Sequence, residues 1–553
     1  MKKTRLIFAL TALFSLFFNV IQSQELNKNA KLFIFPDREF CVSGDTVRFD
    51  VAVNYNDQGK SNIVHVQLTD IDNRLISSVV MRSMNKLADG FIHVPDSLTT
   101  GVYFLSAFFY GQSTTEGEII HQKSLFVYNR FQKDIETIAV PVQKSEGYRI
   151  SKPLIKIIPE KMVYSPRSKV VADIDFREVD SIDIHQVVIK AVLTDSLVRG
   201  YGGNFWSITM PSYPSVPVFD EKDGLVISGR VLIQNTEQPA GKALVFLSLV
   251  NDSMYLDYCV ADSKGYFSFF IKNAQGSGEV ILKAVSEKQE EMVIQLEQSP
   301  LIVKDIYEKL LVQIDSRQKR FIEKTVDGAW LAKLFAPAHF NRPPRFKMPP
   351  RYSLPFYGEP YKVVDPDEYY DLDDFQQIAR ELLPGVRYRA RNNEVTLRLL
   401  QFSKGIYFED EPFRLINGVP VFNNRLLSSL GTVDIDYIEY VTEDRLFGDI
   451  RFPGVLAVYL KEPYYLLTRQ PDVLSVGLYL LQTESSYKYN NPEIHVRNTP
   501  DFRTVYFRQR LKTSSSQRIE FYLSDVKGMV EISVEGITSD GKIFKSSEIV
   551  QVK

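Results

Sequence analysis

Apolar and polar residues alternate along much of the chain, and this is the pattern of β-strands that bury one face. Between Phe40 and Tyr128, one such strand places Val47, Phe49 and Val51 on a single face. Pairs of turn residues such as Gly-Asp and Thr-Gly interrupt the alternation at intervals. The pattern predicts a mainly β chain built from sandwich modules.

Interruptions of this pattern divide the chain into successive modules. We expect a multidomain, mainly β fold of serial immunoglobulin-like β-sandwiches plus one α+β domain. The expected sandwiches cover residues 28–132, 145–215, 224–300 and 470–553. A helical segment is expected over 301–336, a proline-rich basic linker over 337–360, and the α+β domain over 361–465.

The helical segment is predicted to begin at Asp305 and to run to about Ile322. Asp305 and Glu308 have the spacing of a capping box, in which each side chain reaches the other residue's backbone amide. Ile306 and Leu310 then begin an apolar series at every fourth position. Prolines follow, interspersed with arginines and aromatic residues. Because proline fits neither a helix interior nor the hydrogen-bond ladder of a β-sheet, an extended spacer is expected there.

The first 23 residues have the character of a secretory leader. Lys2, Lys3 and Arg5 provide positive charge, and the run Leu6–Phe18 is apolar. That run is too short to cross a bilayer core of about 30 Å, so we expect a signal peptide and an exported chain. No later stretch is apolar enough to predict a transmembrane segment after signal cleavage.

Composition agrees with a folded, exported, strand-rich protein. The chain has 553 residues, of which 44% are hydrophobic and 24% charged, and its 29 Tyr and 37 Phe suit pleated sheets. A formal net charge of −2 gives no reason to expect a nucleic-acid partner. Cys41 and Cys259 could pair in an oxidising compartment, although isolated cysteines in separate modules are more often buried and unpaired.

A search for catalytic motifs gives no candidate, so we expect no enzyme, no cofactor and no metal site. There is no zinc-peptidase pair, no Gly-x-Ser-x-Gly elbow and no phosphate loop. The six histidines are expected to be surface or core residues: His65, His93, His121, His185, His339 and His495. An acidic cluster over 365–374 could bind calcium, but carboxylates before a helix also favour its N-terminus, and this second interpretation is preferred.

Four motifs follow one another in the α+β segment. A Leu-Pro-Gly-Val sequence ends a helix, an Asn-Gly pair between apolar runs predicts a type I′ hairpin, an alternating strand follows, and Gly-rich turns lead into the last strand. The residues of these motifs are Pro384, Gly385, Val386, Asn417, Gly418, Val419, Pro420, Ile435, Ile438, Gly448, Gly454 and Val455.

In this order the motifs resemble the plug domain of TonB-dependent outer-membrane receptors, over roughly residues 370–463. Asn417 stands where that family has Asp, and Leu397-Arg398-Leu399-Leu400 replaces an Ile-Arg-Gly turn. The resemblance implies that the motif residues form an interaction surface for a barrel.

Other segments resemble sandwich families. Residues 28–132 resemble a macroglobulin-like domain, 145–215 a weaker copy and 470–553 a terminal one, whereas 224–300 resembles the non-catalytic carboxypeptidase-regulatory-like sandwich. Neither cysteine lies in the Gly-Cys-Gly-Glu-Gln run of the macroglobulin thioester, which excludes covalent protease trapping.

The plug pattern is not followed by a receptor's barrel. About 90 residues follow Lys461, whereas 22 strands of about 10 residues would be needed. We therefore expect a non-enzymatic exported scaffold in the periplasm, associated with the outer membrane, that docks on or occludes a barrel made by another chain, such as a secretion translocon or uptake receptor. The alternatives are a periplasmic ligand- or peptide-binding protein without a barrel partner, and an envelope peptidase or glycan-processing enzyme.

Overall fold

The computed structural model describes residues 31–54, 62–110, 119–143, 155–176, 184–209, 221, 224–250, 255–272, 276–286, 290–296, 303–304, 307–335, 355–391, 394–461, 472–482, 500–511, 516–538 and 543–553. The predicted leader, most of the predicted linker, Asp305, His339 and His495 lie outside these residues. The chain is mainly β and multidomain, as predicted. None of the helices in the described ranges is long and apolar enough to cross a membrane.

The N-terminal residues form a first sandwich. One sheet has the order β1-β3-β6, with β1 (Lys31–Pro36), β3 (Thr46–Asn54) and β6 (Leu87–His93). The other has the order β21-β14-β8-β7-β4-β5, and β2 also pairs with β8. Its strands are β2 (Phe40–Val42), β4 (Ile63–Asp70), β5 (Leu75–Arg82), β7 (Gly101–Phe108), β8 (Ile119–Tyr128), β14 (Asn204–Thr209) and β21 (Val303–Lys304).

The predicted inward face of β3 is confirmed, because Val47, Phe49 and Val51 are fully buried in the core between these sheets. The opposite face is buried as well: Asp50 and Ala52 are both 0% exposed. A second sandwich covers that face, so β3 is not half-buried as its alternation suggests.

This second sandwich combines two segments that were predicted to be separate modules, 145–215 and 470–553. One sheet contains β10 (Lys156–Pro159), β12 (Lys169–Asp175) and β35 (Gln517–Tyr522). The other has the order β11-β37-β36-β13-β34, with β11 (Val163–Tyr164), β13 (Ile184–Thr194), β34 (Val505–Leu511), β36 (Gly528–Thr538) and β37 (Ile543–Val552). We call it the split sandwich.

The predicted boundary fails because β13 lies between β34 and β36. Ile189 is paired with Gln509 on one side and with Val534 on the other. Alternation shows which face of a strand is buried, but it does not identify the strand that lies beside it.

A middle sandwich is built mainly from residues 224–296. Its sheets are β18-β15-β20 and β17-β16-β19-β33, with β15 (Gly224–Ile233), β16 (Leu244–Val250), β17 (Tyr255–Val260), β18 (Tyr266–Lys272), β19 (Ser277–Val285), β20 (Met292–Leu296) and β33 (Val473–Tyr479). A turn joins β17 to β18: Asp262 Oδ1 accepts hydrogen bonds from the amides of Lys264 and Tyr266, both at 2.8 Å, and Gly265 has a φ of 81°.

The predicted helix from Asp305 is wrong over its first part. Residues Tyr307–Gln313 form strand β22, which pairs with β9 (Thr137–Gln143). The helix α3 occupies Ser316–Phe335, where Asp315 Oδ1 accepts from the amides of Arg317 (2.7 Å) and Gln318 (2.8 Å). A shorter helix, α2, spans Ser196–Tyr201.

Residues from Pro355 to Lys461 form the α+β domain. Its main sheet has the order β23-β29-β32-β27-β28, with β23 (Lys362–Val364), β27 (Phe413–Ile416), β28 (Val419–Pro420), β29 (Ile435–Val441) and β32 (Val455–Leu460). The remaining elements are η4 (Pro366–Glu368), α4 (Phe375–Glu381), α5 (Arg425–Ser428), β24 (Val386–Arg391), β25 (Glu394–Gln401), β26 (Ile406–Tyr407), β30 (Arg445–Phe447) and β31 (Ile450–Phe452).

The domain begins before the predicted end of the linker at residue 360, because Tyr357 is 2% exposed within it.

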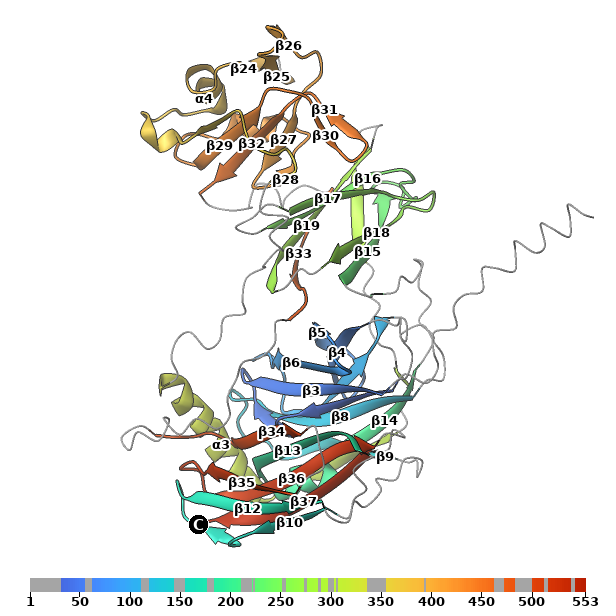
Figure 1. The fold of residues 1–553 in the computed structure, drawn as a ribbon, viewed down its shortest axis with the longest axis vertical. Helices are drawn as coiled ribbons and strands as arrows, with labels where there is room; N and C mark the ends of the chain where they lie inside the picture. The colour runs from blue at the N-terminus through green and yellow to red at the C-terminus, as the bar shows by residue number, and fades with distance from the viewer. Residues whose placement is uncertain are drawn as a thin grey trace, which may run out of the picture.

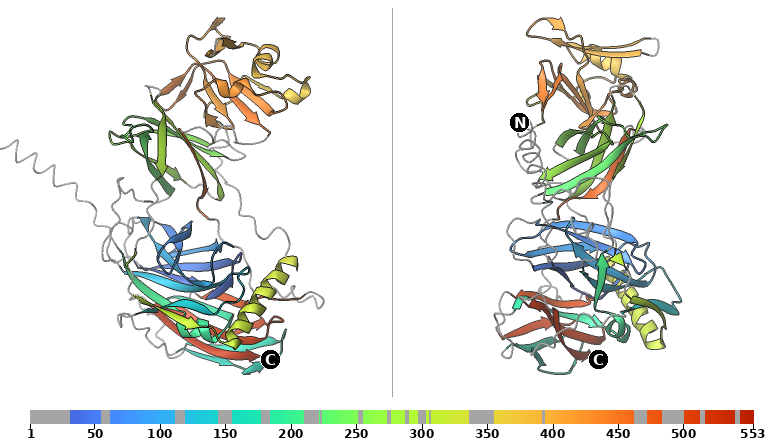
Figure 2. Two further views of the ribbon diagram at one scale, coloured as in Figure 1. Left: turned by 180° about the vertical axis from the view of Figure 1, so that it is seen from behind. Right: turned by 90° about the vertical axis from the view of Figure 1, so that its right-hand side faces the viewer.

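The α+β domain and the middle sandwich lie at one end of the molecule, and the first and split sandwiches lie at the other (Figure 1 and Figure 2). The two ends meet through the residues after β33. Leu480 and Leu481 join Ile63 and Val80 in one apolar core. The side-chain amide of Gln482 accepts a hydrogen bond from the Phe91 N–H at 2.9 Å and donates one to the Phe91 carbonyl at 2.7 Å.

The two cysteines do not form a disulfide. Cys41 is buried in the first sandwich, and Cys259 packs against the core of the middle sandwich. Separate cores hold them, so the folded chain keeps both thiols unpaired.

Candidate interaction site in the α+β domain

The Asn417-Gly418 hairpin forms as predicted. Asn417 has a φ of 49° and Gly418 a φ of 78°, the two positive values that a type I′ turn requires. Ile416 pairs with Val419 across the turn, and Asn417 Oδ1 accepts a hydrogen bond from the Leu460 N–H at 2.8 Å. The turn is therefore tied to the main sheet by its own side chain.

The same hairpin contacts the middle sandwich. Ser248 Oγ on β16 donates to the Gly418 carbonyl at 3.0 Å. Gly448 also faces this sandwich: a Cβ there would collide with the Tyr258 hydroxyl, which accepts a hydrogen bond from the Asp449 N–H at 2.9 Å. Gly418 and Gly448 therefore contact another module of the same chain, whereas the plug resemblance implied an outward surface.

Aromatic rings fill this intrachain interface. Phe413 and Phe452 stack at 4.1 Å between ring centroids, and Phe356 lies 4.6 Å from Phe447. The middle sandwich contributes Phe246, which lies 5.7 Å from Phe413. These aromatic residues could not be assigned to the interface from the sequence, because alternation indicates burial without identifying the module that covers them.

Four other predicted site residues build the core or the backbone of the α+β domain. Ile435, Ile438 and Val455 are 0% exposed. Gly454 has a φ of 88° in the turn that precedes β32. These residues determine the fold and are not available to a partner. Val419 and Pro420 are likewise buried beside the hairpin turn.

The Pro384-Gly385-Val386 motif ends the α4 segment as predicted and leads into β24. Gly385 has a φ of 83° and Val386 is buried. The Tyr440 hydroxyl donates to the Pro384 carbonyl at 3.1 Å, which fixes the turn on the main sheet. Pro384 itself is exposed.

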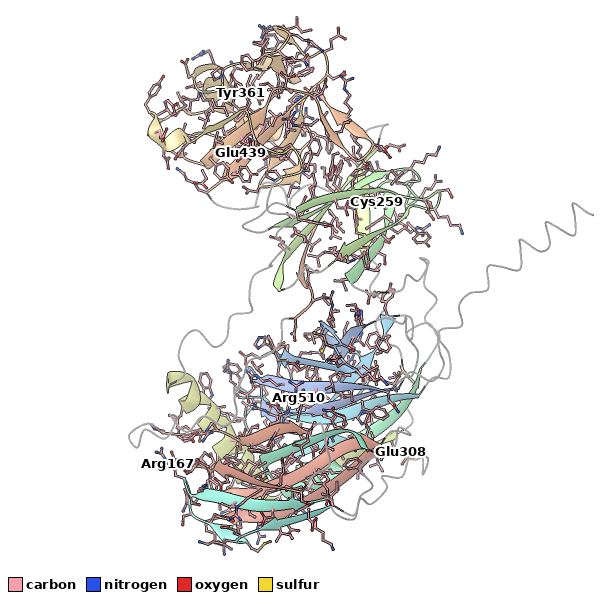
Figure 3. The ribbon with its side chains drawn as sticks, in the orientation of Figure 1. Arg167, Cys259, Glu308, Tyr361, Glu439 and Arg510 are labelled. Carbon is pink, nitrogen blue, oxygen red and sulfur yellow. The ribbon has the colours of Figure 1, made fainter. Side chains whose placement is uncertain are left out.

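An exposed aromatic pair lies beside this turn. Tyr361 and Phe402 stack at 4.9 Å with an interplanar angle of 25°, and they are 57% and 38% exposed. A Cβ on Gly385 would lie 2.8 Å from the Phe402 ring, so the ring rests on the glycine. We call Tyr361, Pro384 and Phe402 the Tyr361 patch; Figure 3 labels Tyr361 on the α+β domain. No motif joins Tyr361 to Phe402 in the sequence, and only folding brings them together.

A cluster of tyrosines lies around Glu439, which Figure 3 labels. The Tyr357 hydroxyl donates to Glu439 Oε2 at 2.6 Å and lies 3.2 Å from the Tyr459 hydroxyl. Tyr437 stacks on Tyr459 at 4.1 Å. Burial raises the pKa of Tyr357, Tyr437 and Tyr459, so these phenols stay protonated far above neutral pH.

The acidic cluster over 365–374 caps helices and forms ion pairs. Asp374 Oδ1 accepts from the Gln377 N–H at 2.8 Å at the start of α4, and Asp365 Oδ1 accepts from the Asp367 N–H at 2.9 Å. Asp367 also pairs with Lys461 at 2.7 Å. Within the described ranges, no group of three or more His, Cys, Asp or Glu is placed to hold a metal ion.

Three histidines have defined partners, and the first of them, His93, has its Nδ1 2.8 Å from Thr46 Oγ1. His65 Nε2 lies 2.5 Å from Glu221 Oε2. Burial lowers the pKa of His121 to about 3, and its neutral ring accepts from the Ile34 N–H through Nδ1 at 3.2 Å. His65 connects strand β4 to Glu221, and His121 connects the two sheets of the first sandwich.

Known proteins resemble this chain only weakly. No protein-family model matches the chain, and no curated protein matches it. Among solved structures, Escherichia coli alpha-2-macroglobulin activated by porcine elastase has 9% identity and a TM-score of 0.22, over 95% of this chain and 44% of that one. The native conformation of E. coli alpha-2-macroglobulin has 9% identity and a TM-score of 0.23, over 96% of this chain and 40% of that one.

The Yersinia pseudotuberculosis adhesin InvE has 11% identity and a TM-score of 0.13, over 68% of this chain and 77% of that one. This chain spans less than half the length of the macroglobulins that it resembles. Similarities at these TM-scores carry no functional argument.

Proposed function

We propose that this chain is a non-enzymatic exported scaffold whose α+β domain docks on an outer-membrane barrel formed by another chain, at the periplasmic side. The observation that carries the proposal is the Tyr361 patch, where two large aromatic side chains stay exposed next to the Pro-Gly turn of the plug-like motif. The proposal assigns no catalytic residue and no cofactor.

The patch has the properties of a binding anchor. Tyrosine and phenylalanine rings bury a large area at a small loss of side-chain freedom, and such residues dominate the energy of many interfaces. Phe402 is held against Gly385, and the turn is held by Tyr440. A patch that is already ordered loses less conformational entropy on binding.

The intrachain interface supports the same proposal indirectly. Because Gly418 and Gly448 contact the middle sandwich, the α+β domain is attached to this sandwich through the hairpin and the β30–β31 turn. The Tyr361 patch stays exposed in this arrangement. A partner would therefore meet the patch and not the Asn-Gly turn.

A double variant tests barrel docking. Tyr361→Ser with Phe402→Ser removes the two exposed rings, and we expect a barrel protein that is recovered with the wild-type chain from cross-linked envelopes to be lost. The control is Phe131→Ser, which removes a 59% exposed ring from the other end of the molecule. Equal recovery of the barrel with the double variant and the control would contradict the proposal.

A second candidate function is peptide binding at the free edge of the main sheet. Strand β23 is at this edge, and Val363 is 53% exposed. Extended peptides add to such edges through main-chain hydrogen bonds. Because β23 pairs with β29 on one side, its other edge is open in the described part of the chain. Val363→Ser removes an exposed apolar side chain from this edge and should weaken peptide capture while barrel recovery stays unchanged.

A further inference from the structure

One face of the β24–β25 hairpin is basic and the other is apolar. Val386, Tyr388, Leu397 and Leu399 are buried on the inner face. The outer face carries three exposed arginines, Arg387, Arg389 and Arg398.

Strand register concentrates this charge. Arg387 is directly opposite Arg398, and Arg389 is opposite Thr396. Like charges that are directly opposite on neighbouring strands destabilise a sheet. The arrangement therefore has a folding cost that a bound anion would remove.

No carboxylate within the described part of the chain forms an ion pair with these three guanidinium groups. Arg387 instead lies over the Tyr407 ring, 3.7 Å from its centroid, which holds the guanidinium in place without neutralising it.

Neighbouring acids are engaged elsewhere. Glu411 pairs with Arg414, Glu443 accepts from Gln401 at 3.1 Å, and Asp444 pairs with Arg451 at 2.9 Å.

The register adds Arg391 opposite Glu394 at the tip of the hairpin. Among the described side chains, Arg387, Arg389 and Arg398 therefore form a cationic surface that no ion-paired carboxylate neutralises.

Apolar side chains border this surface. Ile406 on β26 is 58% exposed, and Phe402 between β25 and β26 is 38% exposed. In Figure 1, β24, β25 and β26 lie at the end of the molecule opposite the C-terminus. Basic and apolar groups thus share one outer end of the molecule.

We propose that Arg387, Arg389 and Arg398 bind the surface of an anionic phospholipid bilayer, while Ile406 enters the headgroup region. Guanidinium groups bind phosphate oxygens in a bidentate manner. Charge attraction combined with a bordering apolar side chain is the basis of peripheral membrane binding. An acidic protein segment would use the arginines but would have no need for the bordering Ile406, so the lipid surface is favoured.

This inference goes beyond barrel docking, because its partner is lipid. Phe402 borders both surfaces, but the three arginines and Ile406 lie outside the Tyr361 patch, so variants of these four residues test lipid binding separately from barrel docking.

Vesicle co-sedimentation of the full chain tests it. The vesicles are pure phosphatidylcholine or phosphatidylcholine with phosphatidylglycerol. We expect binding to the anionic vesicles only, weaker at high salt because screening shortens the range of the attraction. The triple variant Arg387→Gln, Arg389→Gln, Arg398→Gln should bind on the order of 100-fold more weakly, since each basic residue near a charged leaflet contributes roughly fivefold.

A matched triple variant controls for net charge. Arg74→Gln, Arg451→Gln and Arg518→Gln remove three arginine side chains that are 75%, 69% and 52% exposed and are ion-paired with carboxylates. This variant should bind anionic vesicles like the wild type. Circular dichroism melting of both triple variants confirms that they are folded.

A separate variant, Ile406→Ser, keeps the charge and removes the apolar contact. Severalfold weaker binding is expected. Equal binding to neutral and anionic vesicles, or equal loss in the two triple variants, would overturn the proposal. Binding of soluble polyglutamate without binding of anionic vesicles would also overturn it and would assign the face to an acidic protein.

Discussion

Gly454 illustrates, at the scale of single residues, how backbone conformation determines which residue type a turn needs. Its φ of 88° lies in the left-handed region, where a side chain is strained. A Cβ would lie 2.5 Å from the Val441 carbonyl oxygen and 2.7 Å from Leu399 Cδ1. The glycine is required by the close approach of the turn to the sheet, and binding by a partner is not needed to explain it.

Replacing this glycine should destabilise the α+β domain. Gly454→Ala combines backbone strain with a steric overlap, and we expect the free energy of unfolding to fall by about 2 kcal/mol or more. Gly477→Ala is the control, because nothing lies within 4 Å of its Cβ position. Chemical denaturation measures both variants. Equal stability of the two would contradict the steric argument.

At the scale of secondary-structure elements, whether a segment forms a helix or a strand depends on the segments that lie beside it. Residues 307–313 carry an apolar pattern that suits a helix, yet they form β22 because β9 offers a ladder along its whole length. The helix α3 starts where Asp315 can cap it. Inside α3, Gly328 has no positive φ, and a Cβ there would meet Phe502 at an ordinary 3.5 Å.

Gly328→Ala should therefore stabilise the chain. Alanine loses less backbone entropy than glycine in a helix, and the expected gain in unfolding free energy is about 0.5–1 kcal/mol. The reverse change at the next position, Ala329→Gly, should lower it by a similar amount. Thermal melting of the two variants tests the pair. A loss of stability in Gly328→Ala would show that the contact with Phe502 is too tight.

At the scale of the whole molecule, a buried ionic cluster joins the first sandwich to the split sandwich. Glu39 and Lys123 come from the first sandwich, and Lys190, Glu535 and Lys545 from the split one. Lys123 lies 3.0 Å from Glu535, Lys190 3.1 Å from Glu535, and Lys545 3.2 Å from Glu39. Removing one partner from such a cluster leaves an uncompensated buried charge.

This cluster predicts an acid-sensitive interface. Burial raises the pKa of Glu39, but the attraction of Lys545, Lys123 and Lys190 outweighs it and lowers the pKa from 4.5 to about 2. A carboxyl whose pKa is lowered by folding stabilises the folded state at pH values above its unfolded-state pKa. This stability is lost as pH falls from 4.5 towards 2. The contribution is on the order of 3 kcal/mol.

Glu39→Gln should lower the unfolding free energy at pH 7 by about 3–5 kcal/mol. In this variant the unfolding free energy should also decrease less steeply between pH 4.5 and 2. Glu160→Gln serves as control, because that side chain is 49% exposed. Denaturation at a series of pH values gives both slopes. A slope in Glu39→Gln equal to that of the control would exclude Glu39 as the acid-sensitive group.

Local features could be predicted from the sequence because neighbouring residues determine them. The buried face of β3, the Asp262 turn, the Asn417-Gly418 hairpin and the Pro384-Gly385 turn all follow from side-chain period and permitted φ values. The mainly β, multidomain class follows from the same signals.

Only the tertiary structure decided which segments lie side by side. Alternation does not identify β34 and β36 as the partners of β13, so the sequence predicts two modules where the structure has one split sandwich. The plug-like motif residues were predicted as a contact surface, whereas most of them are buried or face the middle sandwich. Folding brings Tyr361 against Phe402, and strand pairing places Arg387 opposite Arg398. Pairing depends on contacts between distant residues, and a period of two along a strand does not record them.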